Sequence, residues 1–153
     1  MSTSATPSQK VVPVLSSDTA GPLGAIHLPR LWLKLSLASA GLLPPDYDEC
    51  GSGFDQMTLS DLGLDRQKTM DYVRTHRPRY MQFEEWVLEQ NGGSISPDRI
   101  EKHNAAVRGY NHDDEKAAKM RDASGIKNVD VLDAVTLNTI EDLDDIYEQI
   151  PRK

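Results

Sequence analysis

The chain has 153 residues, a formal net charge of −7 and 38% hydrophobic residues, enough for one domain with its own core. The acidic excess argues against nonspecific binding to nucleic acid or to anionic membranes, because both require a basic face. A single cysteine, Cys50, excludes an internal disulfide, and the first residues lack the charged start and apolar run of a signal peptide, so we expect a cytoplasmic protein.

Residues 1–21 are rich in Ser, Thr, Pro and Ala, which predicts a flexible or extended N-terminal arm. The apolar run at residues 11–15 interrupts this composition, and it suggests that the arm lies across the body of the protein or across a neighbouring subunit. Residues 22–153 are expected to form a single helical domain. The longest apolar run, residues 31–43, contains Lys34 and is too short to span a bilayer.

The most apolar stretch, residues 21–43, predicts a central helix. Apolar side chains recur at helical spacing and cover nearly all of its faces, which is typical of a helix buried inside a domain. Pro29 suits the first turn, where its missing N–H costs nothing, and Gly41 suits the end. The start of this helix carries three side chains that can be cationic: His27, Arg30 and Lys34.

The rest of the chain reads as further helices separated by turns. A long connection rich in Pro, Gly and Asp covers residues 43–56. Capping and stop signals then predict helices over about residues 58–63, 65–76, 79–90, 96–109 and 113–125, and a last one from Thr139. Residues 128–137 fit either a short strand or an extended arm. The predicted fold is mainly α: a single orthogonal bundle of about six or seven helices.

The three cationic side chains of the central helix are the strongest candidate site. Arg30 and Lys34 are four residues apart and project from one face, while His27 precedes the first turn, where free N–H groups favour anions. Arg30 suits a carboxylate or phosphate, and Lys34 or His27 suits proton transfer, since burial among leucines favours a neutral lysine. Alternatively, Lys34 extends its charge to solvent and Arg30 pairs with an acid.

Other segments supply the remaining candidates. Asp55, in the long connection, is the candidate complementary acid and third catalytic residue. Asn104 is expected on the inner face of its helix, where a buried amide either ties helices together or points into a pocket. The candidate substrate-binding residues are Arg30, Asn104, Trp32 and Tyr47. Cys50 is a weak candidate nucleophile, because no signature pairs it with a particular histidine.

No pattern in the chain implies a cofactor. The GxGxxG, Walker and GxSxG motifs are absent, which argues against nucleotide cofactors and serine hydrolysis. His103 and His112 lack the HExxH, ExxH or CxxC spacing of metal sites, and residues 112–115 look more like a helix cap. No metal site is therefore predicted, although a site of histidines and carboxylates is the third reading of the chain.

Residues 24–34, with Leu28-Pro29-Arg30 at their centre, resemble the uncharacterised bacterial domain-of-unknown-function family number 5069. The resemblance covers about residues 21–110, through residues 47–55, 62–65, 85–87 and 100–104. It implies a small cytosolic helical protein and supports the choice of Arg30, Lys34, Asp55 and Asn104, but it implies no reaction or substrate. Leu33 departs from the family pattern, which tends to have Asp there, and residues 50–53 replace a Cys-Pro-like turn.

Two functions of different classes fit these observations. The first is binding of a polar or anionic small molecule beside the start of the central helix, with a cofactor-independent acid–base step of the lyase, isomerase or hydrolase type. The alternative is a non-catalytic protein–protein interaction module, or a homodimer formed through the N-terminal arm. The acidic C-terminal helix would suit a basic partner.

Overall fold

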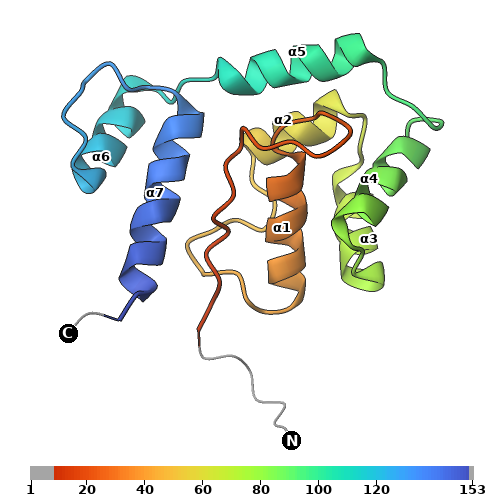
Figure 1. Cartoon of the computed structure of the whole chain (residues 1–153), viewed down its shortest axis with the longest axis horizontal. Helices are drawn as coiled ribbons and strands as arrows, with labels where there is room; N and C mark the ends of the chain where they lie inside the picture. Colours follow the sequence, from red (N-terminus) through yellow and green to blue (C-terminus); the bar gives the residue numbers. More distant parts are fainter. Residues whose placement is uncertain (1–8, 152–153) are drawn as a thin grey trace, which may run out of the picture.

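In the computed structural model, which describes residues 9–151, seven α-helices and no β-strand are found (Figure 1). This confirms the predicted mainly α fold. The helices are α1 (Leu28–Ser39), α2 (Phe54–Asp61), α3 (Arg66–His76), α4 (Tyr80–Glu89), α5 (Pro97–Arg108), α6 (Asp114–Ser124) and α7 (Ala134–Gln149). None of the helices found over residues 9–151 combines the length and the apolar character that a bilayer crossing requires.

Helix α1 lies at the centre of the fold, with α3 and α4 on one side and α7 on the other (Figure 1). Pro29 occupies its first turn, as the sequence predicts. The helix ends where Gly41 adopts a φ of 72°, and Leu42 N donates to Leu37 O at 2.8 Å. A left-handed residue that closes such a bond is the usual glycine-based helix stop.

Two apolar clusters hold the helices together. The larger joins α1 to α2, α3, α4 and the start of α5, and its buried members include Leu28, Leu31, Leu35, Leu59, Val73, Phe83, Val87 and Ile100. The smaller brings α2, α5 and α7 together through Ile26, Phe54, Val107 and Ala134. Helix α5 crosses above α1 and α2 and links this part of the molecule to the pair formed by α6 and α7 (Figure 1).

The described part of the N-terminal arm runs between α1 and α7 (Figure 1). Val11 N donates to Leu42 O at 2.8 Å, and Gln149 Nε2 donates to Lys10 O at 2.8 Å. From residue 9 onward the arm thus lies across the body of the protein, one of the two predicted placements. The first eight residues of the predicted arm lie outside the described residues.

Two helices begin earlier than the sequence predicts. Asp133 accepts from Thr136 N at 2.9 Å and caps α7, so Thr139 lies inside the helix. In residues 128–137 the only ladder pairing described is one bridge between Asn111 and Asp133, and no strand forms. On α7, Asp142 is buried, whereas Leu143 and Tyr147 are 46% and 53% exposed.

Helix α2 likewise begins at Phe54 rather than at Thr58. The predicted cap Thr58 is an interior residue of this helix and is fully buried. The earlier start moves Asp55 from the expected loop into the first turn of a helix. That turn packs beside α1, and it therefore defines the geometry of the site.

Candidate functional site

The site is built around the Asp55 carboxylate. Its Oδ1 accepts from His27 Nε2 at 2.7 Å, and its Oδ2 accepts from Lys34 Nζ at 2.6 Å. Gly51 N also donates to Oδ2, at 2.7 Å. Asp55 is only 3% exposed, so these three donors replace the water that a carboxylate otherwise binds. The structure thus brings together the three residues predicted to be catalytic.

His27 is held in place by an unusual backbone conformation. It is the N-cap of α1 and has a φ of 68°, in the left-handed region that histidine enters more often than most residues. His27 N donates to Thr19 O at 3.2 Å, and its Nδ1 lies 2.9 Å from Ser17 Oγ. Such strain persists where the surroundings dictate it, and here it directs the imidazole between Ser17 and Asp55.

Asn104 holds the chain that leads into α1. Its Oδ1 accepts from Ile26 N at 2.9 Å, and its Nδ2 donates to Gly24 O at 2.8 Å. The neighbouring His103 adds a contact of 2.9 Å from Nε2 to Ile26 O. Of the two roles considered for this amide, tying elements together is the one in the structure, and Asn104 does not line the cavity described below.

Hydrogen bonds, nearby charges and burial determine the protonation states of Asp55 and His27. Burial alone raises the pKa of Asp55, but the hydrogen bond from His27 and the charge of Lys34 outweigh it and hold that pKa well below its usual range. Burial also lowers the pKa of His27, and the hydrogen bond and charge of Asp55 do not fully compensate. At neutral pH, Asp55 is therefore a carboxylate and His27 a neutral imidazole.

These proton positions define the roles of the two imidazole nitrogens. Since Asp55 is ionised and can only accept, Nε2 of His27 carries the proton and donates to it. In the neutral ring Nδ1 is then an acceptor, and the Ser17 hydroxyl donates to it. Ser17 is 2% exposed and was not singled out by the sequence, where it is one of many serines in a polar arm.

A cavity of about 360 Å³ opens above this group. His27, Lys34 and Asp55 lie on its wall with the turn of residues 51–54. Asp48 also lines the cavity. A further wall comes from α6, α7 and the segment before α6, and its residues are Tyr110, His112, Lys116, Ala134 and Asn138. His112 Nε2 lies 3.0 Å from Asn138 Oδ1. Sequence spacing contains no signal for this wall, because its residues are more than 50 positions from Asp55.

The turn before α2 presents backbone donors to the cavity. Within the described residues no side chain caps this helix, and its first turn begins directly after Gly53. Arg66 secures the turn from behind by donating to Cys50 O and, at 2.8 Å, to Gly51 O. Backbone N–H groups at such a position attract anions, and the glycines keep them accessible.

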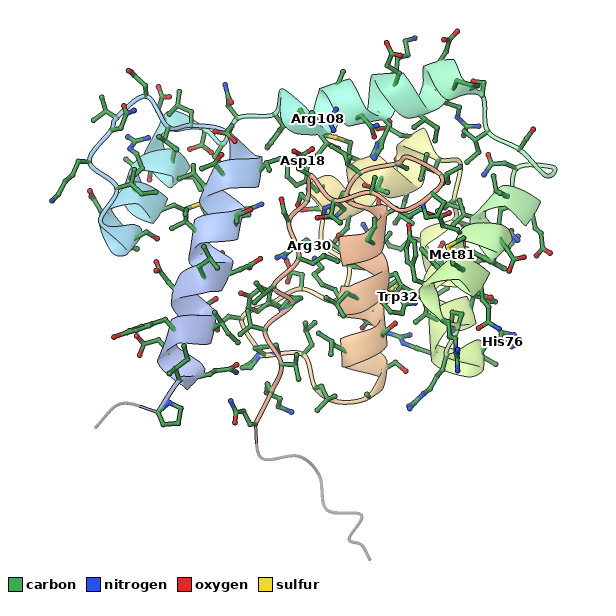
Figure 2. The ribbon with its side chains drawn as sticks, in the orientation of Figure 1. Asp18, Arg30, Trp32, His76, Met81 and Arg108 are labelled. Carbon is green, nitrogen blue, oxygen red and sulfur yellow. The ribbon has the colours of Figure 1, made fainter. Side chains whose placement is uncertain are left out.

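Arg30 reaches the cavity wall, but its guanidinium is occupied. Nη1 donates to Pro13 O at 2.7 Å, to Leu15 O at 2.9 Å and to Asp142 Oδ2 at 2.6 Å. Figure 2 places Arg30 on the side of α1 that faces the arm. The alternative in which Arg30 pairs with an acid is therefore the observed arrangement, and Arg30 ties the arm and α7 to α1.

Like Arg30, Tyr47 contacts α7 through Asp142, and it does not line the cavity. Its hydroxyl lies 2.7 Å from Asp145 Oδ2 and 3.0 Å from Asp142 Oδ1. Burial, together with the bonds and charges of these two acids, raises the pKa of Tyr47 far above its usual value. Tyr47 remains a neutral donor that anchors the connection after α1 to α7.

Trp32 lies on the other side of α1 (Figure 2). Its Nε1 donates to Pro78 O at 3.0 Å, and its ring meets Tyr80 edge-on, with the centroids 5.6 Å apart. Trp32 packs toward α3 and α4 and does not line the cavity. Of the predicted substrate-binding set, only Arg30 reaches the cavity.

The surroundings of Cys50, His103 and His112 do not form a nucleophile or a metal site. Burial is the main cause that raises the pKa of the half-buried Cys50 thiol, which keeps it protonated. His103 pairs with Asp61 at 2.7 Å and lies away from His112. Across residues 9–151, no group of three or more His, Cys, Asp or Glu side chains is arranged to hold a metal ion.

Comparisons with known proteins leave the function to be argued from this site. No protein-family model matches the chain, and no curated protein is significantly similar to it. The resemblance to the family named above stays a prediction.

Proposed function

We propose that the cavity beside α1 binds a small anionic molecule and carries out a cofactor-independent acid–base step on it. The observation that carries this proposal is the Asp55 carboxylate held between His27 and Lys34 on the wall of a cavity. A neutral imidazole, an ammonium and a carboxylate in direct contact provide a base, an acid and a proton carrier.

The hydrogen-bond donors around the cavity favour an anion. Lys34 and Lys116 line it together with the donor-rich turn before α2, whereas the chain as a whole carries a net charge of −7. Arg30 and Asp142 largely cancel each other, as do Lys34 and Asp55, and Asp48 on the same lining offsets Lys116, so the terminus of α2 is the remaining positive feature. A carboxylate or phosphate of the ligand would be attracted to the turn of residues 51–54.

Proton transfer at this site needs no large movement. Lys34 Nζ lies 2.6 Å from Asp55 Oδ2, and His27 shares the other carboxylate oxygen. Because the pKa of Asp55 is held well below its usual range, a proton that Lys34 gives to Asp55 is not retained there but is passed on to the substrate. The pair is thus suited to a lyase, isomerase or hydrolase step in which one substrate atom gains a proton and another loses one.

The test is a thermal-shift titration of the full chain with small carboxylates and phosphates. We expect at least one of them to raise the Tm of the wild type saturably, because a ligand that binds only the folded state stabilises it. Lys34→Met should abolish this shift. Lys119→Met, at a lysine side chain that is 76% exposed and outside the cavity, is the matched control and should respond like the wild type.

Two outcomes would contradict the proposal. One is a wild type that no anion of the panel stabilises, and the other is an unchanged response in Lys34→Met. Circular dichroism of the unliganded variants shows whether each is folded before it is compared.

The alternative, an interaction module or homodimer, is supported by a different part of the surface. Large apolar side chains between 42% and 53% exposed occur on the arm, on α7 and directly after α7: Val11, Val14, Leu143, Tyr147 and Ile150. The bond from Gln149 to Lys10 O places the arm beside the end of α7. Self-association of the full chain, together with no response to any ligand, would favour this alternative over the first proposal.

A further inference from the structure

We infer that Lys34 is a covalent attachment point, at which the amine forms an imine with the carbonyl carbon of a small oxo acid. This inference rests on the proposed function and specifies the substrate class of the same cavity. It assigns Lys34 a role as nucleophile in addition to that of proton donor.

Lys34 differs from the other lysines in its surroundings. Only 8% of it is exposed, and it is the one buried lysine among residues 9–151. It comes from the middle of α1 between the buried Leu31 and Leu35, yet it lies on the cavity wall. A lysine that serves only to keep its charge solvated extends along the surface, whereas a buried one beside a cavity is the arrangement found for imine-forming lysines.

The ammonium of Lys34 also has bonding capacity that the described structure does not use. It has three N–H groups, and within residues 9–151 its one described acceptor is Asp55 Oδ2. The remaining capacity is available to a substrate oxygen in the cavity. A carbonyl oxygen bound there would place its carbon next to the nitrogen, the geometry from which attack proceeds.

The neighbouring groups can move the protons that imine formation requires. As one proton passes from the ammonium through Asp55 Oδ2 to the carbonyl oxygen, the nitrogen lone pair attacks the carbonyl carbon and the C=O π electrons move to that oxygen. That oxygen receives two protons in all, both originally on nitrogen, and leaves as water while the C=N bond forms. An ammonium and a carbonyl give an iminium and water, so atoms and charge balance with no oxidant, reductant or cofactor.

His27 orients the Asp55 carboxylate for this proton relay. Its Nε2–H bond to Oδ1 keeps the carboxylate oriented while Oδ2 gains and loses the proton. Gly51 N, at 2.7 Å from the same Oδ2, adds a donor that is fixed by the backbone. Asp55 therefore returns the proton readily to the departing oxygen.

A carboxylate on the substrate explains the rest of the cavity. The turn of residues 51–54 and Lys116 provide donors for this group on the cavity lining, which also includes Asp48. A volume of about 360 Å³ suits a molecule of a few carbon atoms. A short oxo acid places one charged end at these donors and its carbonyl at Lys34, whereas a simple aldehyde lacks the charged end.

Borohydride trapping of the full chain tests this inference. Wild type is incubated with pyruvate or glyoxylate and sodium cyanoborohydride, which reduces an imine to a stable secondary amine, and is then analysed by intact mass and peptide mapping. We expect one adduct per chain, at Lys34, forming at least tenfold faster than at any other lysine. Acetaldehyde at the same concentration should label Lys34 at least tenfold more slowly than the oxo acids.

The variants separate attachment from general reactivity. Lys34→Arg keeps a cation beside Asp55 but cannot form an imine, and it should lose the adduct, whereas Lys119→Arg should be labelled like the wild type. Asp55→Asn should slow labelling at least tenfold while Lys34 remains present. Labelling that is spread over exposed lysines, or that persists in Lys34→Arg, would overturn the inference.

The proposed function is tested separately with lactate, which has the carboxylate but no carbonyl. A wild type that lactate stabilises, but that neither oxo acid labels, would overturn the imine and leave anion binding intact. A wild type that acetaldehyde labels as fast as the oxo acids would overturn the assigned substrate class. With neither stabilisation nor labelling, both proposals fail together.

Discussion

The two sides of α1 bury their side chains by different means. Toward α3 and α4, Leu31 and Leu35 lie in an apolar cluster with Phe83, and each is at most 1% exposed. Toward the arm and α7, Arg30 and Lys34 are also buried, at 7% and 8%, but each is paired with a carboxylate. The first side needs only shape and apolar surface, whereas the second needs named partners from separate segments.

This difference has an energetic consequence. Apolar contacts lose stability in proportion to the surface or volume removed, so no single partner is essential. A buried ion pair contributes little net stability, but removal of one partner leaves a costly charge. The polar side of α1 is thus retained at a cost, which is consistent with a role beyond folding.

The largest expected effect comes from Arg30→Met. It leaves Asp142 buried without its cation, and we expect the free energy of unfolding to fall by about 3–5 kcal/mol in urea titrations. The double variant Arg30→Met/Asp142→Leu should recover most of this loss, because it removes the orphaned charge. Leu35→Ala should cost about 2–5 kcal/mol, and Asp142→Leu should not rescue it. Failure of the double variant to recover would contradict the assigned cause.

A smaller effect is the pH dependence of stability, which we expect from the polar side of α1 and not from its apolar side. The pKa of His27 is lowered in the folded state, so the unfolded chain takes up that proton first as the pH falls. Its contribution to stability is complete above about pH 6.5 and declines below it, by at most about 1.4 kcal/mol per pH unit. The lowered pKa of Asp55 adds a second loss below about pH 4.

Urea unfolding of wild type and His27→Gln between pH 8 and pH 4.5 measures the first of these losses. The variant should show a shallower decline than the wild type below about pH 6.5. Leu35→Ala, on the apolar side, should give a profile parallel to that of the wild type. Parallel profiles for His27→Gln and wild type would show that His27 is not held neutral.

The smallest expected effect is that of Thr58→Val. Thr58 is fully buried on α2, and its Oγ1 has no hydrogen-bond partner among the described residues, unlike the satisfied polar groups around Asp55. Valine has nearly the same shape and lacks the hydroxyl, so stability should change by less than about 1 kcal/mol, toward a more stable protein. A loss above about 1 kcal/mol would show that the hydroxyl has a partner.

Much of the fold follows from local signals in the sequence. Pro29 and Gly41 bound the central helix as predicted, because a missing N–H and a left-handed glycine act within one turn. Capping signals were less reliable where two competed. Asp133 caps α7 ahead of Thr139. The helix capped by Asp133 forms in place of the shorter one predicted from Thr139, because each further turn adds backbone hydrogen bonds.

Local sequence is enough to place His27 directly before α1 and to put Arg30 and Lys34 on one face of its first turns, because helical spacing alone sets that arrangement. The partner that each of these side chains contacts depends on how the helices pack. Arg30 pairs with Asp142, 112 residues further along the chain, while Asp55 joins His27 and Lys34 because α2 begins early. Partners so distant meet through the packing of whole helices, and no local pattern records that packing.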